Sequence, residues 1–243
     1  MKQNKRYKPF YKQFLQLRKN IQDRQKLFKF KRQKWQNIQR YSKNQLKFYK
    51  RFKIKDQFQS SVPRFASRGN SFQKKFRTNL HERKLFSLFY GGLKRKYLKK
   101  SIIGSIKTKK YNNHIIDFRY KTLQLFESRL DCVLFRSKFC FSFKNAAQLI
   151  LHGHVLVNGV IVTTKSYTLK PNDVVEIAAN SKSRDLVKKS LNRSNFWPIP
   201  PKHLVINYKT LQILFLQSGE PSTTPIFNHY LNLNSIISNI QRY

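Results

Sequence analysis

The stretch 142–162 constrains the fold most, because it carries a helix start, a helix end and a strand turn in close succession. Ser142 is of the residue type that caps helix N-termini, and Gly153 suits the left-handed position that ends a helix. Asn158-Gly159 stands between two β-branched runs and is a strong signal for a two-residue hairpin turn. We therefore predict a helix that runs directly into a β-hairpin.

Apolar spacing on both sides of this stretch extends the module. Leu130, Val133 and Leu134 follow an i, i+3, i+4 pattern, which predicts a first helix within 127–138. Downstream, the turn KPND at 170–173 leads into a third short strand, VVEI. The combined prediction is an α+β fold in which two helices pack on a small twisted sheet.

The charge balance decides the class of partner. The chain has 51 Lys and Arg against 10 Asp and Glu, a net charge of +41. Such a charge opposes compaction by self-repulsion, whereas bound phosphates relieve the repulsion and release counterions. No apolar run approaches the roughly 18 residues of a membrane span, so we expect no membrane partner. The predicted partner is RNA.

The first 61 residues read as a basic, aromatic extension. Residues 1–60 hold 20 Lys or Arg, two acids and 12 aromatic residues. The aromatic residues show no clear amphipathic period, so we expect no local core and ordering only on RNA, where bases stack on the rings. The segment 61–71, with its Pro, Gly and Ser residues, is predicted to be a linker.

The next region, 80–100, has a helical period. Four apolar residues recur at steps of four: Leu85, Phe89, Leu93 and Tyr97. Gly91-Gly92 interrupts them, which predicts two short helices that meet at a glycine turn. A basic cluster without acids follows within 94–100, and we interpret it as a phosphate-contacting face. Residues 101–121 are predicted to be a basic loop.

The polar residues of the module lie outside the apolar faces of its helices. Lys144, Gln148 and His152 lie at steps of four along one side of the second helix. Such a stripe is plain solvent surface in many proteins, but beside Arg136 and Lys138 it becomes a candidate RNA-reading surface. We expect Asp131, one of few acids, to bond a neighbouring Arg or backbone group.

Other chemistry finds little support in the sequence. Cys132 and Cys140 are eight residues apart without a CxxC motif, so we predict two free thiols. His152 and His154 form an H-x-H pair without evident further ligands, and we expect neither a metal nor a cofactor. Nucleophile-elbow, P-loop and dinucleotide motifs are absent from the sequence, which argues against an enzyme.

Three segments of the module closely resemble the RNA-binding domain of small-subunit ribosomal protein four: SRLDCVLFR, NAAQLILHGHVLVNG and SYTLKPNDVVEI. Residues 82–102 are similar to the helical segment that precedes the domain in that family, and 200–243 resemble its C-terminal segment. Related modules occur in RNA-modifying enzymes such as pseudouridine synthases, and in a heat-shock protein that handles stalled ribosomes. An RNA-modifying enzyme and a ribosome-associated RNA-binding factor therefore remain alternatives.

The resemblance implies a two-lobe protein. A mostly helical first lobe would comprise 62–126 and 194–243, the RNA-binding module would be inserted at 127–193, and the basic extension would precede both. The implied function is that of a structural constituent of the small ribosomal subunit, which binds and helps fold the 5′ region of the small-subunit rRNA. The implied partners are this rRNA, neighbouring small-subunit proteins and mRNA at the entry channel, rather than further copies of the chain.

The resemblance also implies a set of RNA-contacting positions. The module contributes eight of them: Arg129, Arg136, Lys138, Ser142, Lys144, Gln148, His152 and His154. The first lobe contributes four: Lys94, Arg95, Tyr97 and Lys99. The zinc-binding cysteine cluster of some family members is absent from the sequence. Abundant Phe, Lys, Asn and Ile suit an A+T-rich organellar genome, which favours a mitochondrial ribosome, with the chloroplast as the alternative.

Overall fold

The computed structural model describes residues 11–18, 21–22, 29–38, 40, 72–109, 118–179, 181–192, 200–216 and 236. The chain divides into two compact units, one made of 1–92 and 226–243 and the other of 93–225. This division differs from the predicted lobes, because the segments 93–126 and 200–216 group with the module. Among the described residues, no helix has both the length and the apolar character that a membrane crossing requires.

The first unit contains helix α1 (Tyr11–Leu17) and helix α3 (Phe72–Phe89). Phe14 and Leu17 of α1 are buried, and the Gln22 amide donates a hydrogen bond to the Leu88 carbonyl at 2.8 Å. The rings of Tyr11 and Phe30 lie 5.4 Å apart. The expectation that the N-terminal segment forms no core is therefore wrong for these residues, while its ordering on RNA stays a prediction.

The glycine turn after α3 is confirmed. Gly91 and Gly92 both have positive φ, of 80° and 81°. The Gly92 amide donates to the Ser87 carbonyl at 2.7 Å, and the Gly91 amide donates to Leu88 at 3.2 Å. This pair of bonds is the Schellman arrangement, which satisfies the last carbonyls of a helix when a residue without a side chain takes the left-handed conformation.

The predicted loop at 101–121 is wrong in its described parts. Helix α4 spans Arg95–Lys109, and α5 spans Phe118–Glu127. Leu98, Ile102 and Ser105 are each only 1% exposed, and their spacing of four and three places them on one face of α4. Because Ser105 is polar, the buried face does not appear as a continuous apolar pattern, and the sequence therefore did not indicate the helix.

The module in the second unit has the predicted elements. Helices α6 (Leu130–Arg136) and α7 (Phe143–Leu151) precede strands β1 (Val155–Val157), β2 (Val160–Ile161) and β3 (Val174–Ile177). Leu130, Val133 and Leu134 are fully buried, as their spacing predicted. Asn158 and Gly159 have φ of 51° and 81°, which is the two-residue turn with positive φ at both positions.

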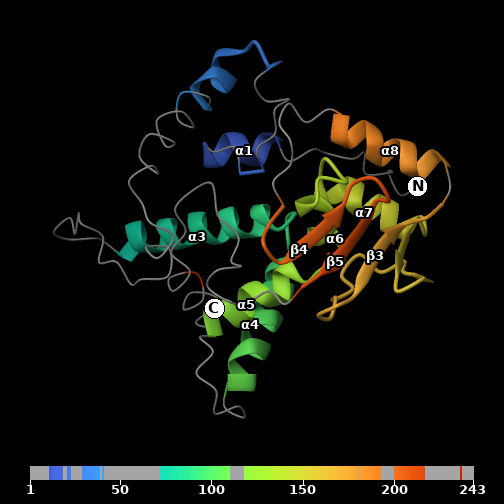
Figure 1. Cartoon of the computed structure of the whole chain (residues 1–243). Helices are drawn as coiled ribbons and strands as arrows, with labels where there is room; N and C mark the ends of the chain where they lie inside the picture. The colour runs from blue at the N-terminus through green and yellow to red at the C-terminus, as the bar shows by residue number, and fades with distance from the viewer. Residues whose placement is uncertain are drawn as a thin grey trace, which may run out of the picture. The chain divides into compact units, whose positions relative to one another are not determined.

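The sheet is larger than predicted. Helix α8 (Ser181–Asn192) follows β3, and strands β4 (Leu204–Asn207) and β5 (Gln212–Phe215) complete an antiparallel sheet of order β2-β1-β3-β5-β4 (Figure 1). Residue Val175 of β3 pairs with Ile213 of β5. The strands at 204–215 thus belong to the module's sheet, whereas we expected them in the first lobe.

One apolar core holds helices and sheet together, which confirms the α+β class. The helices α6 and α7 contribute Val133 and Ile150, and strands β1, β3 and β5 contribute Val155, Val175 and Ile213, all 0% exposed. Because side chains alternate along a strand, every second residue of these strands faces the helices. Val187 of α8 joins the same core, so α8 covers part of the module.

Candidate nucleic-acid interface

The polar stripe of α7 lies at the surface. Gln148 and His152 are exposed and Lys144 is half-buried. The Ser142 hydroxyl accepts a hydrogen bond from the Asn145 amide at 3.1 Å, so this side chain caps the helix, as predicted. Ser142 is 7% exposed, and its placement supports a structural role rather than the predicted RNA contact.

The end of α7 sets the direction of the chain beyond the stripe. Gly153 has φ of 72°, its amide donates to Ile150 at 3.0 Å, and the His154 amide donates to Leu149 at 3.1 Å. This second Schellman arrangement turns the chain directly into β1. It leaves His152 exposed and His154 half-buried on either side of one glycine.

Lys138 lies in the loop between α6 and α7. It has a positive φ of 65° and an exposed side chain whose ammonium lies 5.7 Å from the centre of the Phe135 ring. The Ser190 hydroxyl of α8 donates to the Lys138 carbonyl at 3.1 Å. The loop is therefore held by α8 and presents a fixed cation near the start of α7.

Arg129 and Tyr97 were both predicted to contact RNA, and the structure brings them into contact with each other. The Arg129 guanidinium lies 5.0 Å from the centre of the Tyr97 ring, and it donates to the Asp131 carboxylate at 3.0 and 2.7 Å. Burial by itself lowers the pKa of Arg129, but the hydrogen bond and charge of Asp131 outweigh it and raise the pKa. With Arg129 only 4% exposed, its placement does not support an RNA contact.

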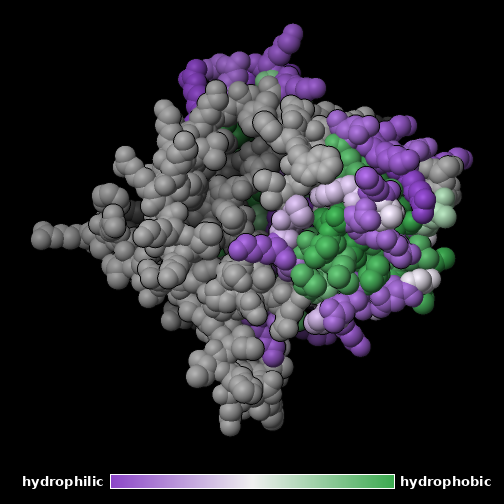
Figure 2. All heavy atoms as spheres, in the orientation of Figure 1, coloured by the Kyte–Doolittle hydropathy of each residue, from purple (hydrophilic) through white to green (hydrophobic). Residues whose placement is uncertain are grey.

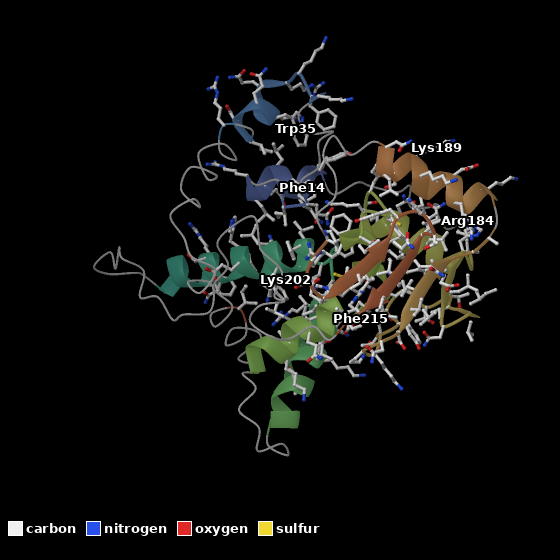
Figure 3. All side chains as sticks on the ribbon, in the orientation of Figure 1. Phe14, Trp35, Arg184, Lys189, Lys202 and Phe215 are labelled. Atoms are coloured by element: carbon white, nitrogen blue, oxygen red, sulfur yellow. The ribbon has the colours of Figure 1, made fainter. Side chains whose placement is uncertain are left out.

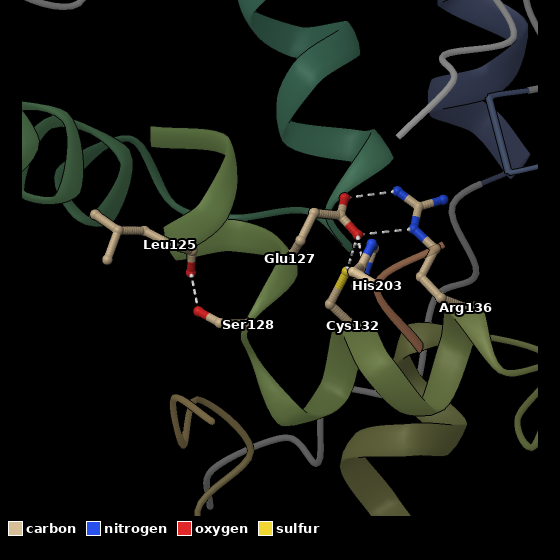
Figure 4. A network of polar contacts seen from close by, with 6 residues as sticks. All are labelled: Leu125, Glu127, Ser128, Cys132, Arg136 and His203. Atoms are coloured by element: carbon tan, nitrogen blue, oxygen red, sulfur yellow. Dashed lines mark hydrogen bonds and ion pairs between the residues drawn. The ribbon is translucent and has the colours of Figure 1, made fainter. Parts of the chain in front are cut away.

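Arg136 takes part in a second buried ion pair (Figure 4). Its Nε and Nη2 donate to the two Glu127 oxygens at 3.2 and 3.1 Å, and the Glu127 side chain is 1% exposed. Cys132 Sγ donates to the same carboxylate at 3.5 Å, and His203 Nε2 lies 3.9 Å from it. The network joins the end of α5, α6 and the residue before β4. Arg136 is 15% exposed, so the side chain predicted to contact RNA serves mainly inside the fold.

Both cysteines are free thiols, as predicted, and both are buried. Burial, reinforced by the negative charge of Glu127, raises the pKa of Cys132 well above its ordinary value. Burial raises the pKa of Cys140 to about 12. Both therefore stay protonated thiols at neutral pH and are poor metal ligands and nucleophiles. Across the described residues, no three His, Cys, Asp or Glu side chains come together in a way that could hold a metal.

The four predicted positions in 94–99 lie at the start of the second unit. Lys94 and Arg95 are exposed, and Lys99 is half-buried. Tyr97 is half-buried beneath Arg129 and also lies 6.4 Å from Phe126, ring centre to ring centre. Lys94 and Arg95 are therefore accessible to a phosphate, whereas Tyr97 is engaged in packing.

Sequence reasoning missed helix α8, which adds to the basic surface. Ser183, Val187 and Ser190 are buried, and four basic side chains are exposed: Lys182, Arg184, Lys188 and Lys189. Figure 2 shows hydrophilic side chains over α8 beside an apolar area over the strands, and Figure 3 shows Arg184 and Lys189 on this helix. The signal for this helix was the spacing of its buried positions 183, 187 and 190. Two of the three are serines, so the spacing did not appear as an apolar pattern.

Comparisons with known proteins agree with this arrangement. Residues 128–175 match the S4 domain family. The chain is 35% identical over 121 residues to small ribosomal subunit protein uS4 of Thermotoga petrophila, covering 50% of this chain and 56% of that protein. It is 36% identical over 131 residues to protein uS4c of Anthoxanthum odoratum, covering 54% and 63%. The chain thus spans a little over half the length of the first of these relatives.

A relative from Kosmotoga olearia is similar over a longer part of the chain than these two. It too is named small ribosomal subunit protein uS4, and it is 34% identical over 158 residues, which is 65% of this chain and 71% of that protein. An alignment of this length extends well beyond the 48 residues of the S4 domain itself. The chain therefore belongs to the family of small ribosomal subunit protein uS4.

Proposed function

We propose that this chain is a structural constituent of a small ribosomal subunit that binds and helps fold the 5′ region of the small-subunit rRNA. The observation that carries the proposal is the basic surface within and beside the S4 domain, formed by the exposed Lys138, the half-buried Lys144 and the exposed cations of α8. In a chain of net charge +41, phosphates supply the countercharge that the sequence lacks.

We propose a smaller set of RNA-contacting residues than the resemblance implied. We keep Lys138, Lys144, Gln148, His152 and His154 as contacts, because their side chains are exposed or half-buried. Lys94, which precedes α4, and Arg95 and Lys99 of α4 remain proposed contacts. The partners proposed with them are neighbouring small-subunit proteins, and mRNA at the entry channel. We propose an organellar ribosome as the location, mitochondrial first, with the chloroplast as the alternative in view of the uS4c relatives.

Filter binding of the full chain to rRNA transcripts tests the proposal. A transcript of the 5′ part of a small-subunit rRNA is compared with a 3′ transcript of equal length, across a series of salt concentrations. We expect tighter binding to the 5′ transcript and a fall of affinity with salt, with a slope of about −0.9 per neutralised phosphate. Equal binding to both transcripts at every salt concentration would contradict specific recognition.

Sedimentation separates the proposed role from a ribosome-associated factor or an RNA-modifying enzyme carrying the same domain. Small subunits that contain the tagged chain are washed at high salt and sedimented. A structural constituent stays with the subunit, because it is buried among rRNA helices and other proteins. Quantitative release into the supernatant would favour the factor or the enzyme.

A further inference from the structure

Two imidazole rings form an unusual pair at the end of α7. The rings of His152 and His154 are parallel to within 6°, and their centres lie 6.1 Å apart. His152 is exposed and His154 is half-buried, so both rings border the solvent. Neither ring serves the core, which the neighbouring apolar residues Leu149, Ile150 and Val155 fill.

Backbone hydrogen bonds fix the positions from which both rings project. Gly153, with φ of 72°, separates the two histidines in the Schellman turn that ends α7. The His154 carbonyl accepts a hydrogen bond from the Ala178 amide at 3.0 Å, which ties this residue to the segment after β3. Rigid placement lowers the entropy that a binding partner would otherwise have to remove.

We propose that His152 and His154 form a stacking platform for an unpaired RNA base, while the stripe on α7 holds the adjoining backbone. This inference rests on the proposed function. Aromatic faces at a solvent border bind bases without regard to sequence, because every base has a π-face. Lys144 precedes His152 by eight residues, which is about 12 Å along the helix axis. It is therefore placed to contact a phosphate of the RNA backbone near the stacked base.

A metal is the competing ligand for a pair of histidines. Zinc sites in proteins use three or four side chains, and the two imidazoles supply only two. The described part of the chain brings no third His, Cys, Asp or Glu to them. The parallel orientation of the rings favours a flat ligand that lies against a ring face.

Three double variants of the full chain separate stacking from charge and from plain surface. His152→Phe with His154→Phe keeps aromatic rings, His152→Lys with His154→Lys replaces the rings by positive charge, and the double alanine variant has neither a ring nor a charge at these positions. The probe is the 5′ rRNA transcript in filter binding with chelator present. We expect the alanine variant to bind roughly 5- to 150-fold more weakly, with an unchanged salt slope, and the phenylalanine variant to bind within about twofold of wild type.

The opposite pattern of RNA binding among the variants would contradict the proposed stacking platform. Restoration by lysine but not by phenylalanine would assign a phosphate contact, and equal binding by all variants would make the pair plain surface. If variants at the half-buried His154 fail to fold, the single changes His152→Ala, His152→Phe and His152→Lys carry the same comparison. Lack of specific binding by the wild-type chain would instead overturn the proposed function, and the platform with it.

Discussion

Helices α6 and α7 are neighbours in the chain, and each carries polar residues that we predicted to face RNA, yet the two use them differently. The arginines at the ends of α6, Arg129 and Arg136, donate to Asp131 and Glu127 inside the fold. The segment of α7 contains no acid, and its Lys144 is half-buried. The buried acids Asp131 and Glu127 thus hold the two arginines of α6 for the fold, whereas we propose that Lys144 contacts phosphate.

The largest expected effect comes from removing a charge beside α6. Asp131→Asn leaves the Arg129 guanidinium, 5% exposed, without its countercharge. Removal of one partner of a buried pair costs about 3–5 kcal/mol, and we expect the lower end because the amide oxygen can still accept a hydrogen bond. Urea unfolding of the full chain measures the change in the free energy of unfolding.

Asp185→Asn on α8 is the matched control, because this carboxylate is exposed. We expect its effect to stay within about 0.5 kcal/mol. Equal effects of the two substitutions would show that the Arg129–Asp131 pair contributes no more than a surface charge, and the distinction between the two helices would lose its physical basis.

A smaller effect should follow from altering the end of α7. Gly153→Ala places a side chain at φ of 72°, and the added Cβ would meet Ile161 Cγ2 at 3.4 Å, an ordinary contact. The cost is therefore that of the left-handed conformation, about 1–2 kcal/mol. Gly104→Ala within α4 is the control, since its Cβ meets nothing within 4 Å and alanine favours a helix by up to about 1 kcal/mol. Thermal melts should shift in opposite directions, and a shared direction would contradict the described turn.

The smallest effect on stability is expected for the stripe itself. Lys144→Ala should change the free energy of unfolding by less than about 0.5 kcal/mol, yet reduce the salt slope of rRNA binding by about one. Arg136→Ala should lower the free energy of unfolding and leave the salt slope of rRNA binding unchanged, because it breaks the pair with Glu127 and leaves that carboxylate buried. A lower free energy of unfolding for Lys144→Ala, with an unchanged salt slope, would contradict the assignment of Lys144 to RNA contact and would give it a structural role instead.

The sequence predicted the structural features that depend only on residues close together in the chain. Ser142, Gly153 and Asn158-Gly159 each act through backbone groups within a few positions, so the cap, the helix end and the hairpin turn were readable. The charge balance and the family resemblance both indicated RNA as the class of partner. The exposure of the residues proposed to contact RNA was not readable in the same way, because it depends on segments that are distant in the chain.

Contacts between distant segments were not predictable from local pattern. Arg129 is buried because Tyr97, from another helix, covers it, and no spacing rule connects these two positions. Strand β5 pairs with β3 across α8 and β4, so its place in the sheet depends on a register that only the folded chain defines. Helix α8 was missed because its buried face is built partly from serines rather than from a continuous apolar stripe.

The position of β5 has a consequence for synthesis of the chain. Val174–Ile177 emerges from a ribosome well before Gln212–Phe215, with which it pairs, and Gln212 follows Ile177 by 35 positions. At 5–20 residues per second this interval lasts roughly 2–7 s. During that time the backbone donors and acceptors along one side of Val174–Ile177 lack their strand partner, in a nascent chain rich in positive charge. The synthesis of β5 therefore determines when this side of β3 gains its strand partner.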